Sequence, residues 1–417
     1  MLSCPLRGPG DFDPLLRRIG EARIVLLGEA SHGTHDYYRL RELLTRRLVA
    51  ECGFSFVAVE GDWPDCDRLH RSVIDAPGAD GDPQAALQRF ERWPTWMWAN
   101  AEVARFLRWL KAWNVERPEP TRVGFHGLDV YSLWESMQAI LDYVGEEDPA
   151  ALQAAEDAYR CFEPYQNRFE EYGMAGRFVS VRCEDEVVHL LTRLRERALA
   201  DGADSFGAWQ NAEVVSSAER YYRAMVAGGP HSWNIRDAHM ADTLDRLLHR
   251  YGPDAKAVVW AHNTHIGDAR ATDMVDEGMF NLGQLARERH GDAQVVLVGF
   301  GGYQGSVIAA PRWGAQPETM LVPAAREGSI EQRMHEELPD QALLIFDGGQ
   351  PGWVTETTDH RAIGVVYDPV LEPWGNYVPT RLGERYDAFV WCDQTTALHP
   401  LPTAPAPGEF ETYPVGT

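Results

Sequence analysis

Histidine and glutamate side chains recur where short apolar runs of the sequence end. Four such positions, widely separated along the chain, deliver an imidazole or a carboxylate: Glu29 and His32, Glu60, His126 and Asp129, and His262 and His265. A neutral imidazole can take a proton from a water or an alcohol when a carboxylate orients its other ring nitrogen. The residue types therefore indicate proton-transfer chemistry.

The catalytic set predicted from these positions is Glu29, His32, Glu60, His262 and His265. His32 is the predicted base, since Glu29 precedes it by three residues and Glu60 follows the next apolar run. His262 or His265 then protonates a leaving group or polarises a carbonyl oxygen. A single histidine at such a position is more often a satisfied hydrogen-bond partner, but convergence of four positions favours function.

A second group of residues is predicted to bind the substrate. Arg39 or Arg41, on the helix after His32, would hold a carboxylate or an oxyanion, and solvated helix charges explain both equally well. The remaining candidates lie after other apolar runs or at the start of a long helical pattern: His126, Asp129, Trp63, Trp233 and Arg236. For the tryptophans, core packing is the competing explanation.

Other chemistries are weaker alternatives. The sequence has no GxSxG elbow, and Ser31 is adjacent to His32, which disfavours a nucleophile–base pair. No cofactor is predicted to be required, and neither a P-loop nor a complete GxGxxG is present. A divalent metal is the open alternative, and its ligands would be His32, Glu60, His262 and His265.

These residues need a scaffold that brings strand ends together. Short β-branched runs at 23–27 and 56–59, with a helical pattern at 37–51 between them, predict a strand–helix–strand unit with parallel pairing. Further strands are predicted at 122–125, 257–260, 295–298, 343–346, 363–366 and 388–391. In such open α/β sheets, ligands bind beyond the carboxyl ends of the strands.

The fold class predicted is α/β, a mostly parallel central sheet flanked by helices, with an inserted helical subdomain. Strand signals are absent between about 134 and 250, where helical patterns such as 184–198 and 208–225 appear. The predicted division is a discontinuous catalytic core at 1–133 and 226–398, a helical insertion at 134–225, and a Pro-rich tail at 399–417.

Bulk properties exclude several partners. With 63 acidic and 39 basic residues the formal net charge is −24, so nucleic acid and anionic membranes are not expected as partners, and a small-molecule substrate is. No apolar run reaches transmembrane length, which makes the cytoplasm the default location. The six cysteines form no CxxC pair, and no disulfide framework is expected.

Several motifs resemble the erythromycin esterase family: GEASHGT (28–34), VEGDWP (59–64), PTWMW (94–98), SWNIRD (232–237), WAHNTH (260–265), GDARAT (267–272) and RAIGV (361–365). The resemblance covers about residues 20 to 400. It implies hydrolysis of a macrolide lactone by water, with His32 as general base and Glu29, Glu60, Arg41 and His262 or His265 in support. The sequence departs from the family pattern at His126, where a tyrosine is common, and at GNY (375–377), where Ser-His-Tyr is usual.

The predicted catalytic residues are compatible with three functions. The first is an ester or lactone hydrolase that acts through water activated by His32, as in macrolide resistance. The second is a secondary-metabolite tailoring enzyme that uses the same acid–base pair for cyclisation, acyl transfer or epimerisation. The third is a protein that sequesters a ligand without chemistry, which the intact cluster disfavours.

Overall fold

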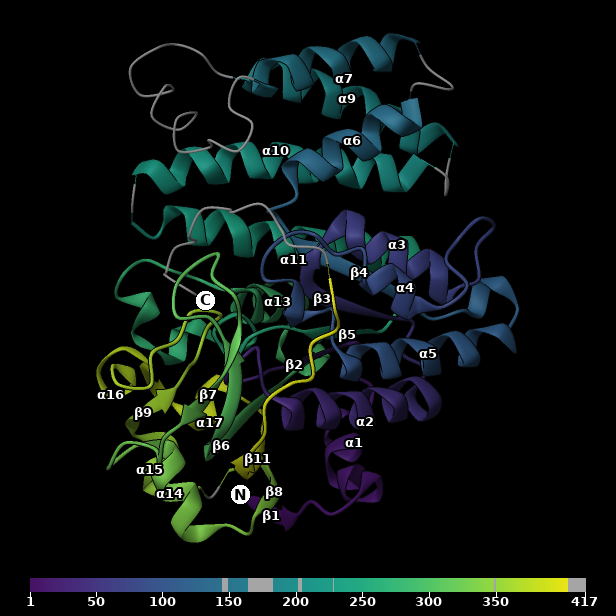
Figure 1. Cartoon of the computed structure of the whole chain (residues 1–417). Coiled ribbons are helices and arrows are strands. Elements are labelled where there is room, and N and C mark those ends of the chain that lie inside the picture. Colours follow the sequence, from purple (N-terminus) through teal and green to yellow (C-terminus); the bar gives the residue numbers. More distant parts are fainter. Residues whose placement is uncertain (145–148, 164–182, 202–204, 228, 349, 404–417) are drawn as a thin grey trace.

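The computed structural model describes residues 1–144, 149–163, 183–201, 205–227, 229–348 and 350–403. The strands are β1 (Leu2–Pro5), β2 (Ile24–Leu27), β3 (Phe56–Asp62), β4 (Gly124–Asp129), β5 (Ala257–Trp260), β6 (Val295–Ala309), β7 (Glu318–Val322), β8 (Gln341–Ile345), β9 (Thr357–Arg361), β10 (Tyr377–Arg381) and β11 (Ala388–Thr395). Figure 1 labels most of these elements.

Helices surround these strands. The helices of the core are α1 (Asp13–Ile19), α2 (His35–Cys52), α3 (Trp63–Val73), α4 (Pro83–Leu87), α5 (Ala101–Val115), α11 (His231–Tyr251), α12 (Asn263–Ile266), α13 (Leu282–His290), α14 (Ile330–Glu337), α15 (Gly352–Thr355), α16 (Glu372–Gly375) and α17 (Leu382–Arg385). Those of the insertion are α6 (Leu133–Val144), α7 (Pro149–Phe162), α9 (Glu184–Asp201) and α10 (Phe206–Ala227).

Nine strands form one mostly parallel sheet, in the order β1-β8-β11-β6-β2-β5-β3-β4, with β7 paired to β6. The six strands from β11 to β4 run parallel, whereas β1, β7 and β8 pair antiparallel. Every residue of β2, β3 and β5 is buried, because strands covered on both faces carry continuous apolar runs. The predicted α/β fold class is confirmed.

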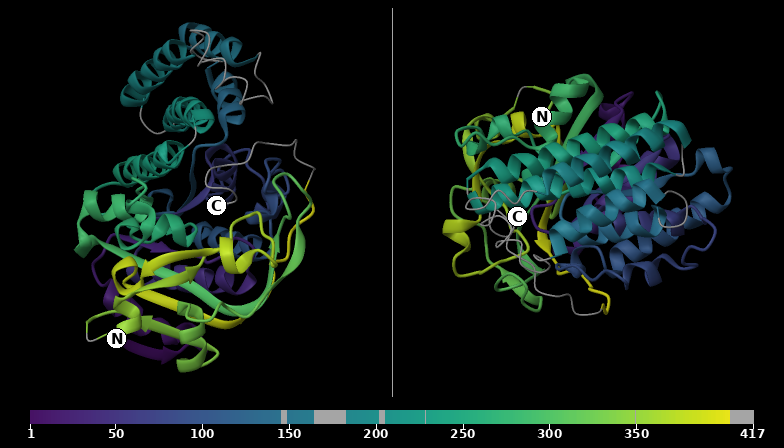
Figure 2. Two further views of the ribbon diagram at one scale, coloured as in Figure 1. Left: turned by 90° about the vertical axis from the view of Figure 1, so that its left-hand side faces the viewer. Right: turned by 90° about the horizontal axis from the view of Figure 1, so that it is seen from above.

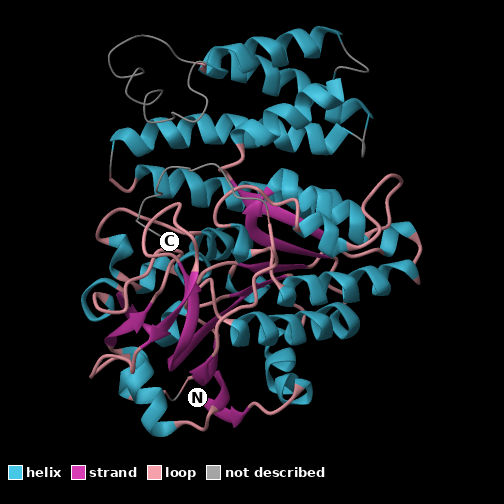
Figure 3. Ribbon diagram, in the orientation of Figure 1, coloured by secondary structure: helices cyan, strands magenta, loops and turns pink. Residues whose placement is uncertain are grey.

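Helices cover both faces of this sheet (Figure 3). Side chains of a strand alternate between the faces, so Val25 and Val57 pack with α2 and α5 while Leu26 and Phe56 pack with α11 and α13. The same alternation applies where the strands end. This alternation determines which polar side chains at the strand ends lie on the same face and can contact one another.

The helical insertion lies beyond α11, at one side of the sheet layer (Figure 2). Its helices α6, α7, α9 and α10 pack on a separate apolar cluster that includes Ile140, Ala155, Leu190 and Tyr221. The helical patterns predicted at 184–198 and 208–225 fall in α9 and α10.

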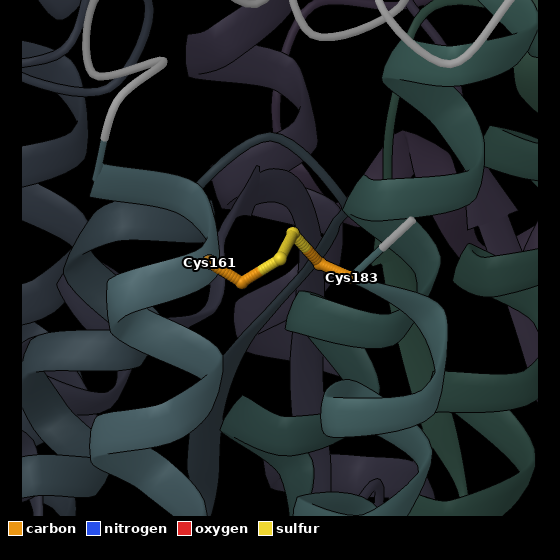
Figure 4. The surroundings of a disulfide bond; sticks show 2 residues. All are labelled: Cys161 and Cys183. Atoms are coloured by element: carbon orange, nitrogen blue, oxygen red, sulfur yellow. A yellow bond between two sulfur atoms is a disulfide. The ribbon is translucent and has the colours of Figure 1, made fainter. Parts of the chain in front are cut away.

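A disulfide joins Cys161 of α7 to Cys183, directly before α9 (Figure 4). The sequence analysis expected no disulfide framework, and it did not anticipate this single bond. The two cysteines are 22 positions apart, and only the antiparallel packing of the two helices brings their Cα atoms to 5.7 Å. Disulfides are typical of oxidising compartments.

Several strand predictions differ from the structure, and the strands predicted at 56–59 and 388–391 extend to Asp62 and Thr395. The run at 363–366 forms only isolated bridges, Ser31 with Ile363 and Ala310 with Val366, because Gly364 lies in a loop crossing the strand ends rather than in the sheet. The strand predicted at 122–125 begins two residues later and runs to Asp129. The strand predicted at 295–298 continues to Ala309.

The chain after β11 is irregular but fixed to the core. Leu398 donates to the Gly33 carbonyl at 3.0 Å, and the Ala101 amide donates to His399 at 2.9 Å. Residues 404–417 of the predicted tail lie outside the described residues. Among the helices of the described chain, none combines the length and apolarity required to cross a membrane.

Candidate active site

The loop between β2 and α2 delivers the first two residues of the predicted set. Nδ1 of His32 lies 2.9 Å from Oε1 of Glu29, and both side chains are buried. Nη2 of Arg41 lies 2.7 Å from the other Glu29 oxygen. The loop passes close to neighbouring backbone, since a Cβ on Gly33 would lie 1.8 Å from the Ile308 carbonyl oxygen. Glu29 thus faces a base on one side and a fixed cation on the other.

Arg236 of α11 links the ends of β3 and β4. Its Nη2 donates to Oε1 of Glu60 at 2.7 Å and to Oδ2 of Asp129 at 2.8 Å, and its Nε donates to Oδ1 of Asp129 at 3.0 Å. All three side chains are buried. Although burial opposes it, the charges of His265 and Arg236 hold the pKa of Glu60 well below its usual range. Glu60 is therefore ionised.

His262 begins the turn after β5. Its backbone amide donates to Oε2 of Glu60 at 2.8 Å, and its ring lies 4.8 Å from that of His32. Nδ1 accepts from the Thr264 amide at 3.3 Å and lies 2.8 Å from the Thr264 hydroxyl. The neutral tautomer consequently carries its proton on Nε2, a buried atom that has no hydrogen-bond partner among the described residues.

His262 stays neutral in this environment. Burial, with a smaller contribution from His32, holds the pKa of His262 well below its usual range. A neutral imidazole that bears a proton on Nε2 is a hydrogen-bond donor.

His265 has the opposite electrostatic environment. Its Nδ1 lies 3.0 Å from both carboxylate oxygens of Asp237, and its Nε2 lies 3.4 Å from Glu60. Burial lowers the pKa, and Arg236, 3.1 Å from Nε2, opposes the charge as well. The Asp237 and Glu60 carboxylates outweigh both and raise the pKa of His265 to about 9. Trp233 stacks on this ring, with centroids 4.4 Å apart and planes 7° apart.

A pocket lies over the carboxyl ends of β3 and β4. About 560 Å³ of open space, including solvent at its mouth, is lined by His32, Glu60, Gly61, Asp62, Asp65, Phe90, Arg92, Pro94, Met97, Trp98, Asp129, Tyr131, Arg236, Trp313 and Val365. Aromatic walls with a few convergent charged groups are typical of sites for small organic ligands. The predicted base His32, although almost fully buried, is one of the residues that line this pocket.

Five of the seven predicted substrate-binding residues are not in the pocket lining: Arg41, which pairs with Glu29, Trp233, which stacks on His265, and three that lie further away, Arg39, His126 and Trp63. Arg39 is two positions from Arg41, about 200° around the helix, and its charge acts on Cys392 of β11. His126 is inside β4, where its Nε2 bonds to the Tyr251 hydroxyl at 2.8 Å. Trp63 stacks on His126 with ring planes 8° apart. None of the three lines the pocket.

Sequence reasoning missed several residues of the site. Asp237, next to Arg236 in the SWNIRD motif, orients His265, and its proximity depends on how α11 crosses β5. Arg92 forms an ion pair with Asp62 and lines the pocket. Asp65 also lines the pocket, and its burial, together with the nearby charge of Asp62, raises the pKa of Asp65 to about 7. The only sequence feature that could have predicted Arg92 and Asp65 as site residues is the pair of carboxylates, Asp62 at the end of β3 and Asp65 at the start of α3, to which no role was assigned.

The carboxylates of the set are already paired with arginines, Glu29 with Arg41 and Glu60 with Arg236. These cations occupy positions that a divalent ion would compete for. Metal binding by His32, Glu60, His262 and His265 stays a prediction.

The fold and the site together define an α/β protein with a buried histidine–carboxylate centre at the carboxyl edge of its sheet. The sequence profile of the erythromycin esterase family matches residues 49–395, and the chain belongs to this family. Membership supports a hydrolase-like function. Erythromycin esterase type II from Escherichia coli is 24% identical over 353 residues, which cover 77% of this chain and 80% of that protein.

Solved structures share the fold. A succinoglycan biosynthesis protein superimposes with a TM-score of 0.79 at 22% identity, over 95% of both chains. An erythromycin esterase variant in its open conformation superimposes with a TM-score of 0.70 at 17% identity, over 95% of this chain and 98% of that one.

Proposed function

We propose that this protein hydrolyses an ester or lactone by attack of a water molecule that His32 deprotonates. The observation that carries the proposal is the hydrogen bond between Nδ1 of His32 and Glu29, at 2.9 Å, on the wall of the pocket. An imidazole held in this way donates from Nδ1 and has Nε2 left to accept a proton. Glu29 then stabilises the imidazolium that forms.

Two further groups would act on the carbonyl of the substrate. Nε2–H of His262, buried and without a partner among the described residues, would donate to the carbonyl oxygen as negative charge develops there. The ring lies 4.8 Å from that of His32, so one carbonyl can be reached by both. The proton taken by His32 is returned to the leaving alkoxide, which completes hydrolysis to an acid and an alcohol.

The pocket wall supports an organic substrate with apolar parts. The aromatic residues Trp98, Trp313 and Phe90 line the pocket together with the charged residues. Macrolactones are the first candidates, because the Escherichia coli relative is an erythromycin esterase. A role in macrolide resistance would follow from activity on that class.

The test is turnover of macrolactones, simple lactones and esters in ¹⁸O-labelled water, followed by mass spectrometry. Wild type is expected to place one label in the acid product, and His32→Ala to lower the rate by at least about 100-fold. His335→Ala, at an exposed histidine remote from the pocket lining, is the matched control and should retain the rate.

Two outcomes would contradict the proposal. Unchanged turnover in His32→Ala would remove the assigned base. Product without label, lost in His32→Ala, would show that the same pair performs acyl transfer or cyclisation.

A further inference from the structure

A second histidine–carboxylate cluster lies outside the lining of the pocket. It is formed by His35, Glu102 and His399, whose candidate ligand atoms all lie within 4.8 Å of one another. His35 is the first residue of α2, Glu102 is in the first turn of α5, and His399 follows β11. Three segments far apart in the sequence therefore meet at one point.

Both imidazoles present the same atom to one oxygen. Nδ1 of His35 and Nδ1 of His399 each lie 2.6 Å from Oε1 of Glu102. The two rings are nearly perpendicular, with an interplanar angle of 88° and centroids 5.3 Å apart. Two imidazole nitrogens and a carboxylate oxygen that converge in this way are the ligand set of His₂Glu metal sites, and a metal ion would displace the protons by which the two nitrogens bond to Glu102.

Among the described residues, no lysine or arginine pairs with the carboxylate of this cluster, whose ion-pair partners are the two histidines. Glu102 is 2% exposed, and burying a carboxylate is costly without a compensating positive charge. Arg105, one turn further along α5, acts on Glu102 electrostatically, but its guanidinium donates to Glu42, with Nε at 2.8 Å. The partners of Glu102 are thus two imidazoles and, at 3.4 Å, the backbone amide of His399, and a bound cation would add a fixed positive charge beside this carboxylate.

The backbone already holds the three segments together. His35 donates its amide to the Thr396 carbonyl at 2.8 Å, and the Ala101 amide donates to His399 at 2.9 Å. The side chain of His399 is 68% exposed, so a cation can enter from solvent and an incoming water can complete the coordination.

We propose that His35, Glu102 and His399 bind a Zn²⁺-type divalent transition-metal ion, with the fourth position open to water. Imidazole with carboxylate favours such ions over Mg²⁺ or Ca²⁺, which prefer oxygen ligands alone. With metal–ligand bonds of about 2.0 Å, tetrahedral ligand atoms lie about 3.3 Å apart. The ring of His399 would therefore withdraw slightly from Glu102, which its exposure permits.

The site would fasten the chain after β11 to the starts of α2 and α5. His35 follows the loop that carries His32 by only three residues, so the ion would also hold one end of that loop. This role is structural and separate from proton transfer by His32.

The experiment is calorimetric titration of the chelator-treated full chain with ZnCl₂, comparing wild type with His399→Ala. Wild type is expected to bind one equivalent at this site with micromolar or tighter affinity, and His399→Ala to weaken it by at least about tenfold. Zn²⁺ should also raise the Tm of wild type and not that of the variant. His335→Ala is the matched control, an exposed histidine that faces a single carboxylate, Asp393.

Because His399→Ala also removes one hydrogen bond to the buried Glu102, the Tm of each protein in chelator is its own reference, and only the change in Tm on adding Zn²⁺ is assigned to binding. If wild type binds two equivalents of Zn²⁺ and His399→Ala still binds one of them with unchanged affinity, that equivalent occupies another site. The proposal is overturned if Zn²⁺ stoichiometry and affinity are the same in wild type and His399→Ala, or if wild type shows no saturable binding.

Discussion

Oε1 of Glu29 lies 2.9 Å from Nδ1 of His32, three residues along the same loop, and both side chains are fully buried. The other oxygen of the carboxylate lies 2.7 Å from Arg41, whose guanidinium sits over the rings of Tyr38 and Trp260. The arginine holds the carboxylate in a fixed orientation, so that the carboxylate in turn fixes the imidazole.

Glu29→Gln is expected to lower kcat by about 10²–10⁴-fold, because an amide cannot stabilise the imidazolium of His32. KM should change little, since Glu29 does not line the pocket. Steady-state kinetics on the substrate found by the labelled-water screen measure both constants. Glu91→Gln, at an exposed glutamate, is the control. A rise in KM at unchanged kcat would contradict the assignment.

The raised pKa of His265 predicts a loss of stability at alkaline pH. Its folded pKa of about 9 exceeds the ordinary value of 6.5, so the contribution is fully present below about pH 6.5 and is lost as pH rises through 9. The loss over this interval is of the order of 3 kcal/mol. Urea unfolding at several pH values measures it.

The comparison variant for this pH dependence is Asp237→Asn. It removes the carboxylate at 3.0 Å from Nδ1 of His265, so the pKa of His265 should fall and the stability profile between pH 6.5 and 9 should flatten. An identical slope in wild type and Asp237→Asn would refute the role given to this pair.

Arg236→Met is expected to destabilise the fold by about 3–5 kcal/mol, because Glu60 and Asp129 would stay buried without their shared cation. In wild type both carboxyls have lowered pKa values, so the stability they contribute is present above their ordinary pKa and lost as pH falls. The deficit of the variant should therefore shrink towards acid pH.

Chemical denaturation at pH 7 and pH 4 tests this prediction. Arg381→Met is its control, because Arg381 pairs with Glu384 on the surface, where such pairs contribute about 0–1 kcal/mol. Equal losses in the two variants would argue against a buried charge network.

Gly33→Ala is expected to cost at least about 2 kcal/mol. The added Cβ would lie 1.8 Å from the carbonyl oxygen of Ile308, so the loop after His32 or β6 must shift. Gly8→Ala is the matched control, since nothing lies within 4 Å of its Cβ position. Thermal unfolding of both variants gives the comparison, and similar Tm values would show that the loop accommodates a methyl group.

The sequence by itself determined the elements that carry the chemistry. Apolar runs such as 257–260 coincide with β5, because a strand buried on both faces requires continuous apolar side chains. The polar residues after β2, β3 and β5 then had to share one edge, since parallel strands end on the same side. This is why Glu29, His32, Glu60 and His262 could be grouped.

Helix crossing, strand alternation and loop paths were decided by the tertiary structure. The turn of α2 selects Arg41 over Arg39 as the partner of Glu29, and alternation along β4 directs Asp129 to the pocket and His126 to Tyr251.

Contacts between residues far apart in the chain could not be predicted from the sequence either. The meeting of Asp237 with His265, the disulfide of Cys161 and the cluster of His35 with His399 join positions 22 to 364 residues apart. No local pattern records such distances, because they depend on how whole helices and segments pack against one another.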